Sequence, residues 1–121
     1  MQKTLNIAVV GCGYWGPNLV RNFRSLSDCV VTTICDVSQD RLKHLKGLYP
    51  EIKGETNYEN LLNDTTLDAI VIATSARTHY AMAKACLEAG KHVLIEKPMA
   101  CATSECEELI KGLNDTAGVY F

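Results

Sequence analysis

The chain has 121 residues, 47% of them hydrophobic and 21% charged, which is the usual size and composition of one globular domain. Its formal net charge of −2 gives no electrostatic reason to expect a nucleic acid or a membrane surface as a partner. No apolar stretch approaches the ~18 residues of a membrane-spanning helix, and the first strand begins too near Met1 for a signal peptide, so we expect a cytoplasmic protein.

The most informative segment is a glycine-rich loop that directly follows an apolar strand predicted over 5–10; it reads Gly11-Cys12-Gly13-Tyr14-Trp15-Gly16. Gly11 allows the tight turn off the strand, Gly13 lets the backbone approach a pyrophosphate, and Gly16 lets the next helix pack closely. That helix directs its free N–H groups and positive dipole end at the phosphates. The order of strand, loop and helix predicts a dinucleotide site, and the alternative is a glycine-rich turn without a ligand.

Asp36 follows the second predicted strand, 29–35, and stands twenty residues after Gly16. A carboxylate at this place can accept hydrogen bonds from the ribose hydroxyls of an adenosine. The alternative is an ordinary turn residue at the end of a strand. Because the strand, the glycine loop and the acid occur together at suitable distances, we favour dinucleotide binding.

The remaining segments alternate between helix and strand, which is typical of a doubly wound parallel α/β sheet with helices on both faces. In chain order they are a helix carrying Leu42, Leu45 and Leu48, a weak strand near 52–55, a short helix opening at 56–59, a strand over 67–73, a helix over 81–89 capped by Thr78, a strand over 92–95, a helix from about 104 to 113 and the start of a sixth strand at 119–121. Right-handed crossovers then predict the strand order 3-2-1-4-5-6.

The six cysteines have no pair with the C-x-x-C spacing of a zinc or redox site; they are Cys12, Cys29, Cys35, Cys86, Cys101 and Cys106. Several lie in apolar stretches, where a free cysteine behaves as a small hydrophobic residue. We therefore expect reduced, mostly structural thiols and no metal site. Cys12 is the exception, because its place near a helix N-terminus is expected to lower the pKa of its thiol.

Two further polar clusters follow predicted strands, and parallel sheets bind ligands beyond the carboxyl ends of their strands. The first is Ala73-Thr74-Ser75 with Thr78-His79, and the second is Glu96-Lys97-Pro98. A lysine such as Lys97 can hydrogen-bond a sugar hydroxyl and relay its proton during hydride transfer. The alternatives are a solvated loop charge for Lys97 and, for His79, a helix-start histidine satisfied within the fold. We assign no role to His44 or His92.

These motifs together resemble the glucose–fructose oxidoreductase/inositol dehydrogenase (Gfo/Idh/MocA) family, and the resemblance covers essentially the whole chain. It implies that Lys97 is the active-site lysine and that the peptide bond before Pro98 is cis. It also implies a cofactor site formed by Gly11, Cys12, Gly13, Tyr14, Trp15, Gly16, Asp36, Ala73, Thr74, Ser75, His79, Glu96, Lys97 and Pro98. With Asp36 in place, NAD is favoured over NADP, because a carboxylate repels a 2′-phosphate.

The chain departs from the family pattern in two places. Ser75 and Ala76 stand where prolines often follow Ala-Thr. Family members also carry a second α/β domain that supplies the substrate pocket and a catalytic histidine, and that builds the usual dimer. We therefore expect residues 1–121 to be the dinucleotide-binding domain alone, inactive by itself, with oligomerisation left to the full-length protein.

The predicted function is that of an oxidoreductase that transfers a hydride between NAD and a secondary alcohol of a sugar, nucleotide sugar or polyol. One alternative is a stand-alone, non-catalytic module that binds or senses NAD(H). Another is a homoserine- or dipicolinate-type reductase. Glu96-Lys97-Pro98 favours the first function over both alternatives, because a pure sensor has no evident need for Lys97.

Overall fold

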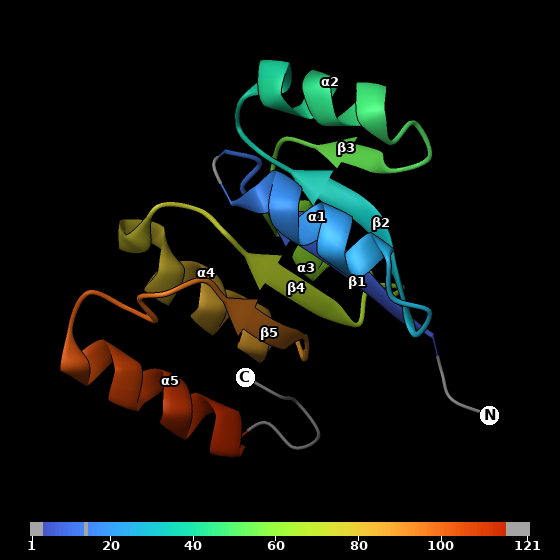
Figure 1. The fold of residues 1–121 in the computed structure, drawn as a ribbon. Helices are drawn as coiled ribbons and strands as arrows, with labels where there is room; N and C mark the ends of the chain where they lie inside the picture. The colour runs from blue at the N-terminus through green and yellow to red at the C-terminus, as the bar shows by residue number, and fades with distance from the viewer. Residues whose placement is uncertain (1–3, 14, 116–121) are drawn as a thin grey trace.

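Parallel strands form the centre of the molecule in the computed structural model, which describes residues 4–13 and 15–115. Within these residues the sheet has five strands in the order β3-β2-β1-β4-β5, visible from top to bottom in Figure 1. In chain order the elements are β1 (Leu5–Val10), α1 (Gly16–Arg24), β2 (Cys29–Cys35), α2 (Gln39–Leu48), β3 (Lys53–Glu55), α3 (Glu59–Leu62), β4 (Ala69–Ile72), α4 (Ala76–Glu88), β5 (His92–Ile95) and α5 (Thr103–Asp115).

The predicted doubly wound sheet and the order of its first five strands are confirmed. The sixth strand, expected at 119–121, lies outside the described residues. The predicted start of the fourth helix was wrong by about one turn. Ser75, not Thr78, occupies the N-cap of α4, and the Thr78 hydroxyl donates to the Ser75 carbonyl oxygen at 2.7 Å from within the first turn.

The sheet separates two hydrophobic clusters, because successive side chains of a strand point to opposite faces. Ile7 and Val9 of β1 pack with Val20 of α1 and with Leu42 and Leu45 of α2. On the other face, the cluster of buried side chains that includes residues of α3, α4 and α5 is formed by Ala8, Val10, Cys35, Leu61, Leu67, Ile70, Ile72, Ala83, Cys86, Leu87, Val93 and Leu109. Burial on both faces explains why β1 and β4 are almost continuously apolar.

The place of β1 determines where the loops meet. β1 pairs with β2 on one side and with β4 on the other, so the chain builds outward to β3 and then returns past β1. All these pairings are parallel, and the loops after β1, β2, β4 and β5 therefore leave the same edge of the sheet. Ligands of such sheets bind outside the carboxyl ends of the strands, where the strand order reverses. In the part of the chain described, no helix is both long and apolar enough to cross a membrane.

Lys91, just before β5, stabilises this arrangement from the opposite edge. Its side chain is buried, and Nζ donates to the carbonyl oxygens of Asp64 at 2.6 Å and Leu67 at 2.9 Å. We expect Lys91→Met to lower the free energy of unfolding by roughly 1–3 kcal/mol, because both carbonyls lose their buried donor. Urea unfolding at an unchanged m-value measures the effect.

Lys84→Met is the matched control for Lys91. The Lys84 side chain is 47% exposed and pairs with Glu108 at 3.4 Å. An exposed ion pair contributes at most about 1 kcal/mol. The free energy of unfolding of Lys84→Met is therefore expected to stay close to that of the parent protein. A loss for Lys91→Met no larger than for Lys84→Met would show that the buried hydrogen bonds of Lys91 are not a major source of stability.

Candidate functional site

A cavity of about 600 Å³ lies at the carboxyl edge of the sheet, where the loops after β1, β2 and β4 meet. The predicted site residues that line it are Gly11, Gly13, Trp15, Asp36, Ala73, Thr74 and Ser75. Cys12 and Gly16 are buried within the glycine loop and belong to its support. His79 is buried beside the cavity, and Glu96, Lys97 and Pro98 follow β5 outside the lining. Tyr14, the remaining predicted residue, lies outside the described residues.

The three loop glycines differ in what requires them. Gly11 has a φ of +96°, and a Cβ there would lie 2.6 Å from the Ala73 carbonyl oxygen. A Cβ on Gly16 would overlap the Gly11 carbonyl oxygen. A Cβ on Gly13 would meet only the flexible Arg41 side chain, at 3.2 Å from Nη1. The fold therefore requires glycine at 11 and 16 but not at 13, where only a movable side chain lies beside the bare Cα on the cavity lining.

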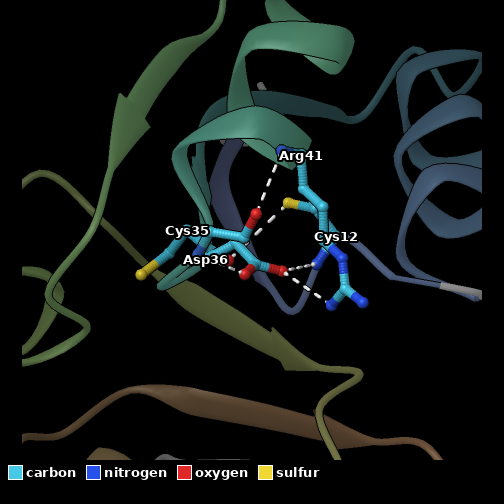
Figure 2. Close-up of polar contacts among 5 residues, drawn as sticks. Cys12, Cys35, Asp36 and Arg41 are labelled. Carbon is cyan, nitrogen blue, oxygen red and sulfur yellow. Dashed lines mark hydrogen bonds and ion pairs between the residues drawn. The ribbon is translucent and has the colours of Figure 1, made fainter.

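Asp36 connects the glycine loop to the end of β2, as Figure 2 shows. Its Oδ2 accepts a hydrogen bond from the Cys12 N–H at 2.7 Å, and its Oδ1 accepts one from the Ser38 N–H at 2.8 Å. Arg41 Nη1 lies 3.7 Å from Oδ2, and the Arg41 side chain is 59% exposed. Each carboxylate oxygen has more than one acceptor site, so Asp36 can still accept hydrogen bonds from a ligand in the cavity.

The expectation of a low pKa for the Cys12 thiol was wrong. Burial, together with the neighbouring Asp36 charge, raises the pKa of Cys12 to about 12. Desolvation of the thiolate and the nearby carboxylate outweigh the positive end of α1. Cys12 therefore contributes its backbone N–H and not a reactive thiol. All six cysteines are free, as predicted.

The loop after β4 forms the opposite wall of the cavity. The hydroxyls of Thr74 and Thr78 are 2.6 Å apart, and the Thr74 hydroxyl also lies 3.7 Å from Met82 Sδ. These side chains present polar and apolar atoms to the same space, with Ser75 exposed beside them. This wall is continuous with the glycine loop, since the Ala73 N–H donates to the Val10 carbonyl at 2.8 Å.

The loop after β5 lies next to this wall. The Glu96 N–H donates to the Ile72 carbonyl oxygen at 2.9 Å, which extends the pairing of β5 with β4. Lys97 is exposed, and the Lys97–Pro98 peptide bond is cis, as the resemblance implied. Among the described residues, no three His, Cys, Asp or Glu side chains come together in a group that could hold a metal ion.

Sequence reasoning missed several side chains that line the cavity: Val37, Arg41, Thr56, Asn57, Tyr58 and Met82. The sequence did contain an indication that Arg41 lies at the site, because Arg41 is in the first turn of the helix that follows the predicted acid. The segment 56–58 had none, since only the tertiary fold brings the loop after β3 to the cavity that Asp36 lines.

Comparison with known proteins identifies a matching family model and similar proteins. A family model described as "Oxidoreductase family, NAD-binding Rossmann fold" matches residues 5–121. Myo-inositol 2-dehydrogenase of Thermotoga maritima is 30% identical over 107 residues, which are 88% of this chain and 32% of that protein. Glycosyl hydrolase family 109 protein 3 of Phocaeicola vulgatus is 35% identical over 116 residues, covering 89% of this chain and 21% of that protein.

Solved structures agree with the fold. The crystal structure of GenD2 from gentamicin A biosynthesis, in complex with NAD, superposes with a TM-score of 0.90 at 26% identity. The match covers 97% of this chain and 33% of that one. The chain thus spans about a third or less of the length of these proteins.

Proposed function

This chain belongs to the Gfo/Idh/MocA oxidoreductase family, in its NAD-binding Rossmann-fold part, and from that membership we propose that NAD binds in the cavity at the carboxyl edge of the sheet. One observation supports this proposal most. The fold does not require a glycine at Gly13, yet its bare Cα faces only the flexible Arg41 side chain at the loop before α1, on a cavity that Asp36 also lines. A backbone that must approach a pyrophosphate needs that arrangement.

The cavity residues divide into two halves, as expected of a sheet built from two mononucleotide-binding units. Asp36 and Arg41 would hold the adenosine half, with the carboxylate accepting hydrogen bonds from ribose hydroxyls. Thr74 and Ser75, in the loop after β4, would hold the nicotinamide half together with the segment Glu96–Pro98. Bound NAD supplies a hydride acceptor there. Lys97 Nζ would hold or relay the proton of the substrate hydroxyl.

For the whole protein we propose hydride transfer between NAD and a secondary alcohol of a sugar, nucleotide sugar or polyol. The similarity to a myo-inositol 2-dehydrogenase supports a polyhydroxylated substrate. The relatives give no support to a stand-alone sensing module. Because the chain spans about a third of their length, we propose that residues outside 1–121 complete the substrate pocket and make any oligomer contacts. A cytoplasmic location stays a prediction from the sequence.

The similarity to a glycosyl hydrolase family 109 protein favours a second candidate, net glycoside hydrolysis by a protein with the same cofactor domain. The two candidates differ in stoichiometry. A dehydrogenase produces one NADH for each alcohol oxidised, whereas net hydrolysis releases a sugar without accumulating NADH. Parallel measurement of NADH absorbance and released sugar in the full-length protein distinguishes them.

Cofactor choice tests the role of Asp36 directly. We expect the 121-residue chain to bind NAD at least about tenfold more tightly than NADP, a difference of ~1.4 kcal/mol, because the Asp36 carboxylate repels a 2′-phosphate. Asp36→Asn removes the charge and should reduce the preference for NAD over NADP. Arg41→Ala removes the cation 3.7 Å from Asp36 Oδ2 and should increase it. Calorimetric titration of each variant with both cofactors measures the ratios.

The opposite signs of the two variants make this test specific. A general loss of structure would weaken the binding of NAD and NADP equally and leave the ratio of the two affinities unchanged. Equal or tighter binding of NADP by the parent chain would overturn the assignment of Asp36 to the ribose. Absence of binding by either cofactor would overturn the proposed function itself.

A further inference from the structure

His79 connects the two loops that carry the proposed nicotinamide half of the site. It lies in the first turn of α4 and is 1% exposed. Its Nδ1 is 2.6 Å from the Pro98 carbonyl oxygen, and its Nε2 is 2.9 Å from the Thr74 carbonyl oxygen. Thr74 lines the cavity, and Pro98 directly follows Lys97. One buried ring thus connects the wall after β4 to the backbone next to Lys97.

The ring of His79 lies between two backbone acceptors. A carbonyl oxygen can only accept, so a hydrogen bond between the ring and either loop is donated by a ring nitrogen. Which nitrogen carries the proton depends on the tautomer, and both nitrogens lie less than 3 Å from a carbonyl oxygen.

Simple filling of the core does not account for this arrangement. A histidine that only filled space would need one partner for its single N–H, and an apolar side chain would serve as well. At His79 both polar atoms face backbone, and the two backbone segments come from different strand ends. The partner atoms are both carbonyl oxygens, which only accept, so neither loop donates to the ring. His79 itself does not line the cavity and has no ring nitrogen left over for a ligand.

We propose that His79 is a positioning residue whose buried ring, lying between the Thr74 and Pro98 carbonyl oxygens, holds these two backbone segments in the geometry that receives the nicotinamide and places Lys97 beside it. This inference rests on the proposed function, since it concerns one half of the proposed NAD site. It assigns His79 an indirect role, in place of the direct cofactor contact that the sequence suggested.

The test compares two ligands on the 121-residue chain. ADP-ribose contains the adenosine, pyrophosphate and second ribose of NAD but lacks the nicotinamide. We expect His79→Ala to weaken NAD binding by about tenfold, the size expected for one or two lost hydrogen bonds, while ADP-ribose binding stays within about twofold. His44→Ala, an exposed histidine on α2, is the matched control and should change neither.

Two conservative variants guard against simple unfolding. The amide of His79→Gln can reach the position of Nε2, and that of His79→Asn the position of Nδ1, so each can keep one of the two hydrogen bonds. Both are expected to fall between the parent chain and His79→Ala in NAD affinity.

The outcomes are distinct. If His79→Ala weakened the binding of NAD and ADP-ribose equally, His79 would have only a structural role and the proposal would be overturned. Unchanged NAD binding in His79→Ala would overturn it as well. Failure of the parent chain to bind either ligand would instead overturn the proposed function on which it rests. The proposal would be supported if NAD binding were weakened more than ADP-ribose binding, most in His79→Ala and less in His79→Gln and His79→Asn.

Discussion

Replacing Gly13 with valine is expected to weaken NAD binding by at least about 100-fold while the chain keeps its fold. The reason is the difference between the loop glycines. A side chain at 13 meets only the flexible Arg41 guanidinium within the protein, but it fills the space through which the backbone would approach a pyrophosphate. Calorimetric titration with NAD measures the loss, and urea unfolding of the same sample shows whether the fold is kept.

Two other glycine variants serve as controls for Gly13→Val. Gly47→Val introduces the same side chain on α2, where a Cβ has no neighbour within 4 Å, and should leave NAD binding unchanged. Gly16→Val should instead unfold the chain, because its Cβ overlaps the Gly11 carbonyl oxygen. If Gly13→Val bound NAD with the affinity of the parent chain, the glycine loop would not be the phosphate site.

Lys97→Ala in the full-length protein is expected to lower turnover by roughly 10²–10⁴-fold, the range for loss of a positioned acid–base group. Lys97 is exposed at the end of β5, away from the glycine loop, so NAD affinity should change far less than turnover. Steady-state kinetics with a sugar or polyol substrate, combined with NAD titration, separates the two effects.

The control is Lys43→Ala, which removes an exposed lysine on α2. Its turnover should match that of the parent protein. Near-normal turnover in Lys97→Ala would reduce Lys97 to a solvated loop charge. A further check uses residues 1–121 alone, which should bind NAD without oxidising a sugar. Detectable NAD reduction by this chain would overturn the proposal that substrate contacts lie outside it.

The fold was predictable because the strongest signals are local. Continuous apolar runs reveal the buried parallel strands, and the glycine loop with Asp36 marks the first crossover. The start of α4 was misplaced because Ser75 and Thr78 are both acceptable helix caps, and the choice depends on how the chain leaves β4. Boundaries of this kind are determined by tertiary packing, which periodicity does not report.

The candidate site was predictable where the residues follow strands, and not where packing decides. Asp36 and Thr74 follow strands, so the topology alone brings them to one edge. Cys12 was misjudged because the helix N-terminus is visible in the sequence, whereas burial beside a carboxylate is not. The pairing of His79 with Pro98 joins residues 19 positions apart, and nothing in the local pattern indicates it.

The hydrogen bonds of Asp36 also bear on how quickly a ligand can associate. Because the carboxylate already holds the Cys12 and Ser38 N–H groups, much of the glycine loop is pre-organised before any cofactor arrives. The entropy of ordering those backbone segments is lost during folding and not during association. Encounter with NAD therefore needs little rearrangement of the described loop, and differences in affinity among adenine dinucleotides should lie mainly in their rates of dissociation.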